Sequence, residues 1–300
     1  MGKFFIVGCA RSGTTMLQQA LGRHSQIVIP PETAFFADFL GRSRPRQLHQ
    51  IRQINADLQI ALDEPIRRVT SDTEARKIFE EMGRQYLARV GRTEVTCFGE
   101  KTPRHLRYYR RIFDLFPEAR IIVLYRDGRD VALSLAEAPW GPTDVYYHFA
   151  RWLVDVAWQR RLEGDGGDRV CSVRYENLVA RPAEELRTLA EFLGLPYESE
   201  MAEGHGKPQD LLVREQGWKA RAVEAITPSR TERWRRELTE EQNRRMERWG
   251  GKVLRSLGYE TITDGTRRLP VMFFPRLYAR QLTWKARWAL RNVRLAVAER

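Results

Sequence analysis

The chain has 300 residues, with 51 Lys and Arg against 39 Asp and Glu, a formal net charge of +12. Hydrophobic residues make up 42% and aromatic residues 10%, which is ordinary for a folded protein and excludes a disordered or collagen-like chain. The three cysteines form neither a disulfide framework nor a CxxC metal pair, and no apolar run approaches the roughly 20 residues of a membrane span. We therefore expect a folded cytoplasmic protein without a signal peptide.

The N-terminal part of the chain alternates between strand-like and helix-like segments. Residues 3–7 form an apolar run typical of a buried strand, and a helix is expected over 13–22 after a glycine loop. Residues 27–29 indicate a second short strand. From 33 to 95 the pattern is mostly helical and rich in arginine but carries no chemical motif, so we expect a helical insert that serves as a lid or an acceptor-binding cap.

The alternation continues towards the C-terminus. Further strands are predicted over 95–98, 121–125 and 170–174, the second of which is the strongest in the chain. Helices are expected to begin at Pro103 and to cover 130–137, 145–162, 183–194 and 240–258, with a turn over 164–167. Strands that alternate with helices predict an α/β fold with a parallel sheet flanked by helices, in a single domain over 1–265.

The loop after the first strand reads GCARSGTT, from Gly8 to Thr15, and opens a helix. Its glycines allow a tight turn, and the N–H groups of the loop and the helix start can point at an anion. The spacing matches GxxxxGK[ST] except that Thr14 replaces the lysine that reaches the β- and γ-phosphates of a nucleoside triphosphate. The sequence therefore predicts a P-loop type of α/β fold whose loop holds a single phosphate, and it argues against ATP or GTP hydrolysis.

Three motifs together resemble one enzyme family. Residues 11–15, RSGTT after an apolar strand, resemble the 5′-phosphosulfate loop of sulfotransferases that use 3′-phosphoadenosine 5′-phosphosulfate (PAPS). Residues 126–134, RDGRDVALS, are similar to the family's 3′-phosphate motif, an arginine at a strand end with a serine eight residues on. Residues 174–178, RYENL, resemble a signature whose tyrosine lies near the nucleotide. The resemblance covers residues 3–260. It is closest to the protein-tyrosine and Golgi carbohydrate sulfotransferases, and we expect a bacterial type of family member.

The resemblance implies an enzyme that transfers a sulfuryl group in line from PAPS to a hydroxyl or amine, without a metal, and releases 3′,5′-adenosine bisphosphate. The acceptor would be a small molecule, a carbohydrate or a lipid. The nucleotide would be bound by residues of the three motifs and of a late loop that matches the family poorly: Arg11, Ser12, Gly13, Thr14, Thr15, Arg126, Ser134, Tyr175, Ser229 and Arg230. Asp127 in the second motif could also simply cap a helix.

The resemblance also implies catalytic residues. Glu32 lies 21 positions beyond Arg11, the spacing at which the tyrosine and Golgi enzymes carry an acceptor-site glutamate, and we expect it to be the general base. Lys101 precedes Arg126 by 25 residues and, with Arg11, would neutralise the departing phosphate. His105 is the alternative base, by likeness to the phenol and steroid sulfotransferases. Glu32 could instead be an exposed carboxylate at a helix start, and Lys101 a solvated loop lysine.

The tail after residue 265 is basic. Residues 267–300 hold nine Lys or Arg and one acid, so most of the net charge lies in the tail and we expect no nucleic-acid partner. Arginines and apolar residues form separate stripes over 277–297, which predicts an amphipathic helix. That helix would contact anionic lipid as a peripheral membrane element, bind an acidic partner, or dock on its own domain.

Two other functions are compatible with parts of the sequence. One is a P-loop kinase for a nucleotide or small molecule, in which residues 121–127 would carry a metal-holding aspartate. The lysine missing at position 14 counts against it. The other is a non-catalytic binder of nucleic acid or membrane, which explains the charge of the tail but none of the motifs.

Overall fold

The computed structural model describes residues 1–138, 141–203 and 230–263, and the chain divides into two compact units. One unit comprises Met1–Arg126 and Asp155–Ser229, the other Asp127–Val154 and Arg230–Arg300. The single domain over 1–265 stays a prediction, and the predicted tail helix lies outside the described residues.

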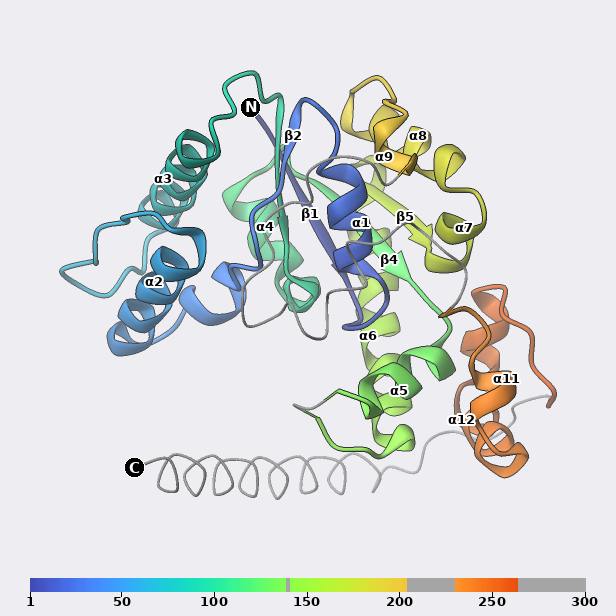
Figure 1. Cartoon of the computed structure of the whole chain (residues 1–300). Coiled ribbons are helices and arrows are strands. Elements are labelled where there is room, and N and C mark those ends of the chain that lie inside the picture. Colours follow the sequence, from blue (N-terminus) through green and yellow to red (C-terminus); the bar gives the residue numbers. More distant parts are fainter. Residues whose placement is uncertain (139–140, 204–229, 264–300) are drawn as a thin grey trace, which may run out of the picture. The chain divides into compact units, whose positions relative to one another are not determined.

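The first unit is built on a parallel five-stranded sheet in the order β2-β3-β1-β4-β5 (Figure 1). The strands are β1 (Gly2–Gly8), β2 (Ile27–Val28), β3 (Cys97–Lys101), β4 (Arg120–Tyr125) and β5 (Val170–Arg174). All five were predicted to within a few residues. Since the strands run in one direction, their carboxyl ends meet at one edge of the sheet, which is where ligands bind in open α/β folds.

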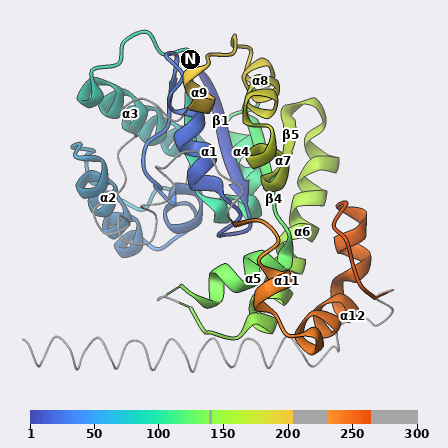
Figure 2. The ribbon, with the colours of Figure 1, turned by 45° about the vertical axis from the view of Figure 1, so that its right-hand side comes forward.

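The central strand β1 is buried on both faces, which explains its unbroken apolar run. Phe4 and Ile6 belong to a core cluster with residues of α1 (Thr14–Leu21) and α8 (Pro182–Leu193) (Figure 2). On the other face, the Phe5 ring lies 5.5 Å from that of Phe36 and 5.9 Å from that of Phe79, measured between ring centroids. Successive side chains of a strand point to opposite faces, so β1 binds the two layers together.

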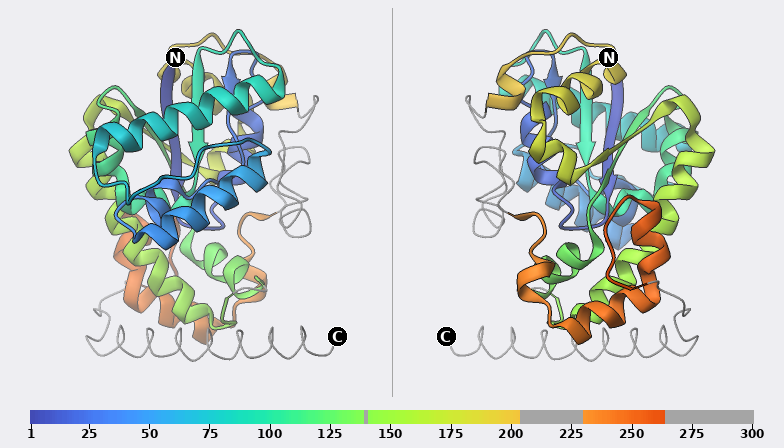
Figure 3. Two further views of the ribbon diagram at one scale, coloured as in Figure 1. Left: turned by 90° about the vertical axis from the view of Figure 1, so that its left-hand side faces the viewer. Right: turned by 90° about the vertical axis from the view of Figure 1, so that its right-hand side faces the viewer.

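The segment 33–95 is helical as predicted. It contains η1 (Phe35–Phe39), α2 (Arg44–Leu58) and α3 (Asp72–Val90), and Figure 3 shows α2 and α3 side by side. The Ser71 hydroxyl accepts a hydrogen bond from the Glu74 N–H at 3.2 Å and so caps α3, which ends at Gly91 with a φ of 67°. The predicted role of this insert as a lid or cap stays a prediction.

One local prediction is wrong. Instead of turning at 164–167, α6 (Val145–Gly166) continues to Gly166, and only Gly167 adopts a left-handed φ, of 56°. A Cβ atom at position 166 would lie 2.2 Å from Val170 Cγ2. The glycine therefore serves the close packing of the helix end on β5 rather than a turn, and sequence alone does not separate these two uses.

The remaining elements of the first unit follow the chain. They are η2 (Pro103–Tyr108), α4 (Tyr109–Leu115), η3 (Gly167–Arg169), α7 (Tyr175–Ala180) and α9 (Glu200–Glu203). The helix predicted to begin at Pro103 starts as a 3-10 helix and continues as α4.

The second unit contains α5 (Gly128–Ala136), the first part of α6, α11 (Trp234–Glu237) and α12 (Glu240–Ser256). α5 packs closely on α6, since a Cβ at Gly128 would lie 2.3 Å from a Trp152 ring carbon. A capping box between Thr239 and Gln242 begins α12. Over the described ranges of both units, no helix is long and apolar enough to cross a membrane.

Candidate active site

The loop between β1 and α1 has the backbone of an anion-binding loop. Arg11 has a φ of 70°, which is uncommon for a residue with a side chain, and Gly13 has a φ of 100°. The Ser12 N–H donates to the Cys9 carbonyl at 3.2 Å and closes the turn before α1. The first turn of α1 carries no acidic residue. Its N–H groups and the positive end of its dipole therefore favour a bound anion.

The Ser12 hydroxyl can donate a hydrogen bond to a ligand. Its side chain is fully buried, and its hydroxyl has no hydrogen-bond partner among the residues that the structure describes. A buried hydroxyl without a partner is costly, so a ligand oxygen that accepts from it would stabilise the loop. The loop from Arg11 to Thr15 thus fits the 5′-phosphosulfate end of PAPS.

Residues of the first and third motifs and Arg126 of the second meet at the carboxyl edge of the sheet. A Cβ at Gly13 would lie 2.5 Å from Tyr175 Cδ2, so the ring of the third motif requires glycine in the first. The Arg126 guanidinium carbon lies 4.3 Å from the centroid of the Tyr175 ring, and Arg126 Nη1 donates to the Arg11 carbonyl at 3.0 Å. Arg126 therefore supports the left-handed residue of the loop. Its contact with a 3′-phosphate stays a prediction.

A buried lysine connects this loop to the predicted base. Lys101 is the last residue of β3, and its Nζ lies 3.2 Å from Thr15 Oγ1 and forms an ion pair with Glu32 Oε1. The Lys101 side chain is 1% exposed, so the alternative of a solvated loop lysine is wrong. The Glu32 side chain is 26% exposed and keeps access to a molecule outside the fold. The structure thus brings a cation, a carboxylate and the start of α1 together.

His105, the alternative base, is fully buried and engaged at both ring nitrogens. Its Nε2 accepts the Phe36 N–H at 3.1 Å, which places the proton of a neutral ring on Nδ1. Nδ1 lies 2.7 Å from Glu100 Oε2, a close electrostatic contact whose direction departs from that of a good hydrogen bond. A side chain held in this way is poorly placed to take a proton from an acceptor. This geometry therefore favours Glu32 over His105.

Three polar residues next to the site were missed by the sequence analysis. Thr33, Glu100 and Thr102 are all buried, and the Glu100 carboxylate accepts hydrogen bonds from both threonines. The available signal was the position of Glu100, an acid one residue before Lys101 and two residues after a strand-like run. A charged residue buried inside a strand usually has dedicated partners.

The other predicted ligands lie in the second unit or outside the described residues. Ser134 is buried in α5, and Arg230 forms an ion pair with Glu137 at 3.4 Å. Asp127 caps α5, since its side chain accepts the Arg129 N–H at 2.9 Å. Ser229 falls on the part of the chain that is not described. The pairing of Ser134 with Arg126 stays a prediction.

The chain is similar to known proteins over most of its length. The sequence model of the "Sulfotransferase family" matches residues 3–199. Nodulation protein NoeE of Sinorhizobium fredii is 29% identical over 287 residues, 85% of this chain and 65% of that protein. Protein-tyrosine sulfotransferase 1 of Danio rerio is 25% identical over 211 residues, 66% of this chain and 54% of that protein. The chain thus spans less than two thirds of either relative.

A solved structure agrees with the fold. The sulfotransferase domain of the Synechococcus PCC 7002 olefin synthase matches with a TM-score of 0.59 at 18% identity, over 86% of this chain and 94% of that domain. At this identity the likeness concerns the fold alone, and it confirms the predicted P-loop type of α/β fold.

Proposed function

Because the chain belongs to the sulfotransferase family, we propose that it transfers a sulfuryl group from PAPS to a hydroxyl or amine of an acceptor. Lys101 carries this proposal, since its ammonium group reaches both Thr15 at the start of α1 and the carboxylate of Glu32. When bound, PAPS supplies the sulfuryl group and a phosphate leaving group. Thr15 and Glu32, which both contact Lys101, would then lie next to PAPS and next to the sulfuryl acceptor, respectively.

Different residues would neutralise the charge of the leaving group and accept the proton of the acceptor. Arg11, Lys101 and the N–H groups at the start of α1 offset the negative charge that develops on the leaving phosphate, and one such donor is typically worth about 3–4 kcal/mol in the transition state. Glu32 accepts the proton of the acceptor group, a role worth about 100- to 10,000-fold in rate. The proposal needs no metal, because these groups take up the charge. Tyr175 and Arg126 hold the loop and, with Ser134 and the 229–230 segment, the nucleotide.

The proposal extends to the acceptor and the location. We propose a small-molecule, carbohydrate or lipid acceptor for a cytoplasmic enzyme whose basic tail makes peripheral contact with a membrane. The charge of residues 267–300 and the partial exposure of Glu32 support it.

Calorimetry separates this function from its main competitor. A sulfotransferase should bind 3′,5′-adenosine bisphosphate without magnesium. Binding of ATP that depends on magnesium, with no response to the bisphosphate, would instead indicate a kinase.

The role of Glu32 is tested by Glu32→Gln. We expect unchanged affinity for the bisphosphate and a loss of turnover of about 100-fold or more, because the amide cannot accept the proton. Turnover is measured as release of the bisphosphate from PAPS, with water, a phenol, a tyrosine peptide, an oligosaccharide and a hydroxylated lipid as acceptors. Glu184→Gln, at an exposed carboxylate paired with Arg181, is the matched control and should keep full turnover. Full turnover of Glu32→Gln would transfer the role to another base.

A further inference from the structure

The carboxylate of Glu100 bonds to Thr33, the residue that follows the proposed base, and does not take part in the chemistry described above. We propose that Glu100 is a positioning residue that holds Glu32 at Lys101 by accepting hydrogen bonds from both the N–H and the hydroxyl of Thr33. This inference rests on the proposed function, because it gives Glu32 the role of general base.

One oxygen of Glu100 receives three hydrogen bonds. Oε1 accepts from the Thr33 N–H at 3.1 Å, from the Thr33 hydroxyl at 2.9 Å and from the Thr102 hydroxyl at 2.7 Å. Glu100 is fully buried, and both threonines are 1% exposed. Water is therefore kept away from these bonds, and the carboxylate depends on its protein donors.

The residues that these bonds join are the chain neighbours of Glu32 and Lys101. Thr33 directly follows Glu32, and Glu100 directly precedes Lys101. A single carboxylate therefore joins the segment that carries the base to the strand that carries the lysine, across 67 residues of sequence. The ion pair between Glu32 and Lys101 forms at this junction.

The backbone after Glu32 is held by side chains of the segment 100–105. Its N–H groups donate to Glu100 at Thr33, to the Thr102 hydroxyl at Ala34 (3.2 Å) and to His105 Nε2 at Phe36 (3.1 Å). Ala34 has a φ of 50°, a left-handed conformation that costs free energy for a residue with a side chain. Such a conformation persists where surrounding contacts enforce it, and here those contacts fix the direction in which the chain leaves Glu32.

A purely structural role would make Glu100 matter for folding alone. A positioning role predicts that its loss reduces turnover through Glu32 while the phosphate loop, on the other side of Lys101, still binds nucleotide. A double-mutant cycle separates these two roles.

The cycle uses Thr33→Val, which keeps the shape of the side chain but removes the hydroxyl that bonds to Glu100 and to the Phe35 N–H, while the bond from the Thr33 N–H to Glu100 remains. We expect kcat to fall about 10-fold or more, as for a displaced catalytic group, with an unchanged dissociation constant for 3′,5′-adenosine bisphosphate. Thr33→Ser, which keeps the hydroxyl, should restore kcat to within about twofold. In the Glu32→Gln background, Thr33→Val should cost nothing further. Asn243→Leu is the matched control and should keep kcat, because it replaces a buried polar side chain that bonds to Arg129 and Glu247 instead.

The outcomes distinguish this inference from the proposed function. An equal cost of Thr33→Val in both backgrounds, or no rescue by Thr33→Ser, would overturn the positioning role while leaving Glu32 as the base. Full turnover of Glu32→Gln would reject the proposed base instead.

A crystal structure of Thr33→Val gives a readout that does not depend on turnover. We expect Glu32 to have left Lys101, and an ion pair that persists unchanged would contradict the inference. If Thr33→Val does not fold, the isosteric Glu100→Gln is put through the same cycle and the same structural comparison.

Discussion

The residues of the candidate site are charged groups that the fold keeps away from water. Lys101, Arg126 and Glu100 are each less than 5% exposed. A buried charge is tolerated only where it is paired and hydrogen-bonded, so each of these side chains has its position set by specific partners. This burial explains why a few residues suffice to orient the site.

Glu100 remains ionised at neutral pH in spite of its burial. Burial by itself would raise the pKa of its carboxyl, but the His105 ring and the hydrogen bonds from Thr102 and Thr33 outweigh it and leave the pKa below the ordinary value of 4.5. A lowered folded-state pKa contributes stability that is present above the unfolded value and is lost as the pH falls through the folded value. The carboxylate is therefore a permanent acceptor for Thr33 under neutral conditions.

His148 makes folding sensitive to mild acid. Burial lowers the pKa of His148 to about 4, against an ordinary 6.5, although the nearby Pro142 carbonyl acts in the opposite direction. The unfolded chain then binds a proton that the folded chain does not, so stability is lost as the pH falls from about 6.5 towards 4. We expect about 3 kcal/mol to be lost over this window. Urea unfolding at pH 7.5 and pH 4.5 measures it.

His148→Gln isolates this contribution. It keeps a donor for the Pro142 carbonyl, which the His148 Nε2 contacts at 2.6 Å, but cannot be protonated. The variant should lose less stability between the two pH values than the wild type does. His49→Gln, at an exposed position, should behave like the wild type. Equal pH dependence in all three proteins would contradict the assignment.

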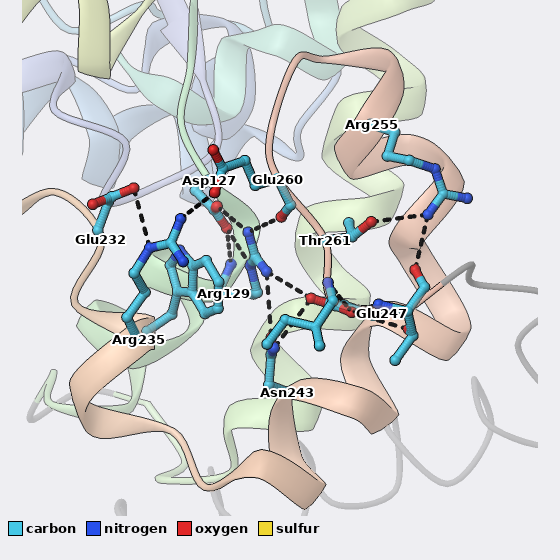
Figure 4. A network of polar contacts seen from close by, with 12 residues as sticks. Asp127, Arg129, Glu232, Arg235, Asn243, Glu247, Arg255, Glu260 and Thr261 are labelled. Carbon is cyan, nitrogen blue, oxygen red and sulfur yellow. Dashed lines mark hydrogen bonds and ion pairs between the residues drawn. The ribbon is translucent and has the colours of Figure 1, made fainter.

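Among the elements, α5 depends on one arginine for its attachment within the second unit. Arg129 is fully buried, and its guanidinium bonds to Asp127 at 2.7 Å and Glu247 at 2.9 Å and to the Glu260 carbonyl at 2.7 Å (Figure 4). Its guanidinium carbon also lies 3.5 Å from the centroid of the Trp234 ring. Arg129 thus joins α5 to α11, α12 and the segment that follows α12.

Arg129→Met tests this attachment. The substitution would leave Asp127 and Glu247 buried without their cation, and we expect a loss of about 3–5 kcal/mol in the free energy of unfolding, measured with urea. Arg235→Met is the matched control in the same network, since Arg235 is 40% exposed and pairs with Glu232 and Glu260. It should cost less than about 1 kcal/mol. Similar costs for the two variants would show that burial does not decide the effect.

The sequence predicted the elements well because each strand and helix has a strong local pattern. The prediction was less accurate at β3. The strand was expected to end at residue 98, but it continues to Lys101. The extension matters, because it turns Glu100 and Lys101 from loop residues into buried residues of the sheet. The sequence does not predict this burial, because Glu100 and Lys101 are charged residue types and their partners, Thr33 and Glu32, lie almost 70 residues away.

At the scale of the whole molecule, the main feature is the uneven distribution of the net positive charge along the chain, most of which lies in residues 267–300. We expect deletion of residues 267–300 to leave binding of 3′,5′-adenosine bisphosphate intact, since the predicted ligands lie earlier in the chain. The deletion should abolish co-sedimentation with vesicles of anionic lipid, because the tail carries nine Lys or Arg and one acid. Unchanged sedimentation would reject a lipid-binding role for the tail, and weakened nucleotide binding would show that the tail supports the enzyme body.

The sequence by itself determined the alternation of strands and helices, the phosphate loop and the family, because these depend on short contiguous patterns. Only the tertiary structure decided which distant residues meet: Gly13 with Tyr175, Lys101 with Glu32, and Glu100 with Thr33. It also showed that both ring nitrogens of His105 are engaged. The physical reason is that contacts between parallel strands and their loops form through space, at one edge of a sheet, and leave no periodic trace along the chain.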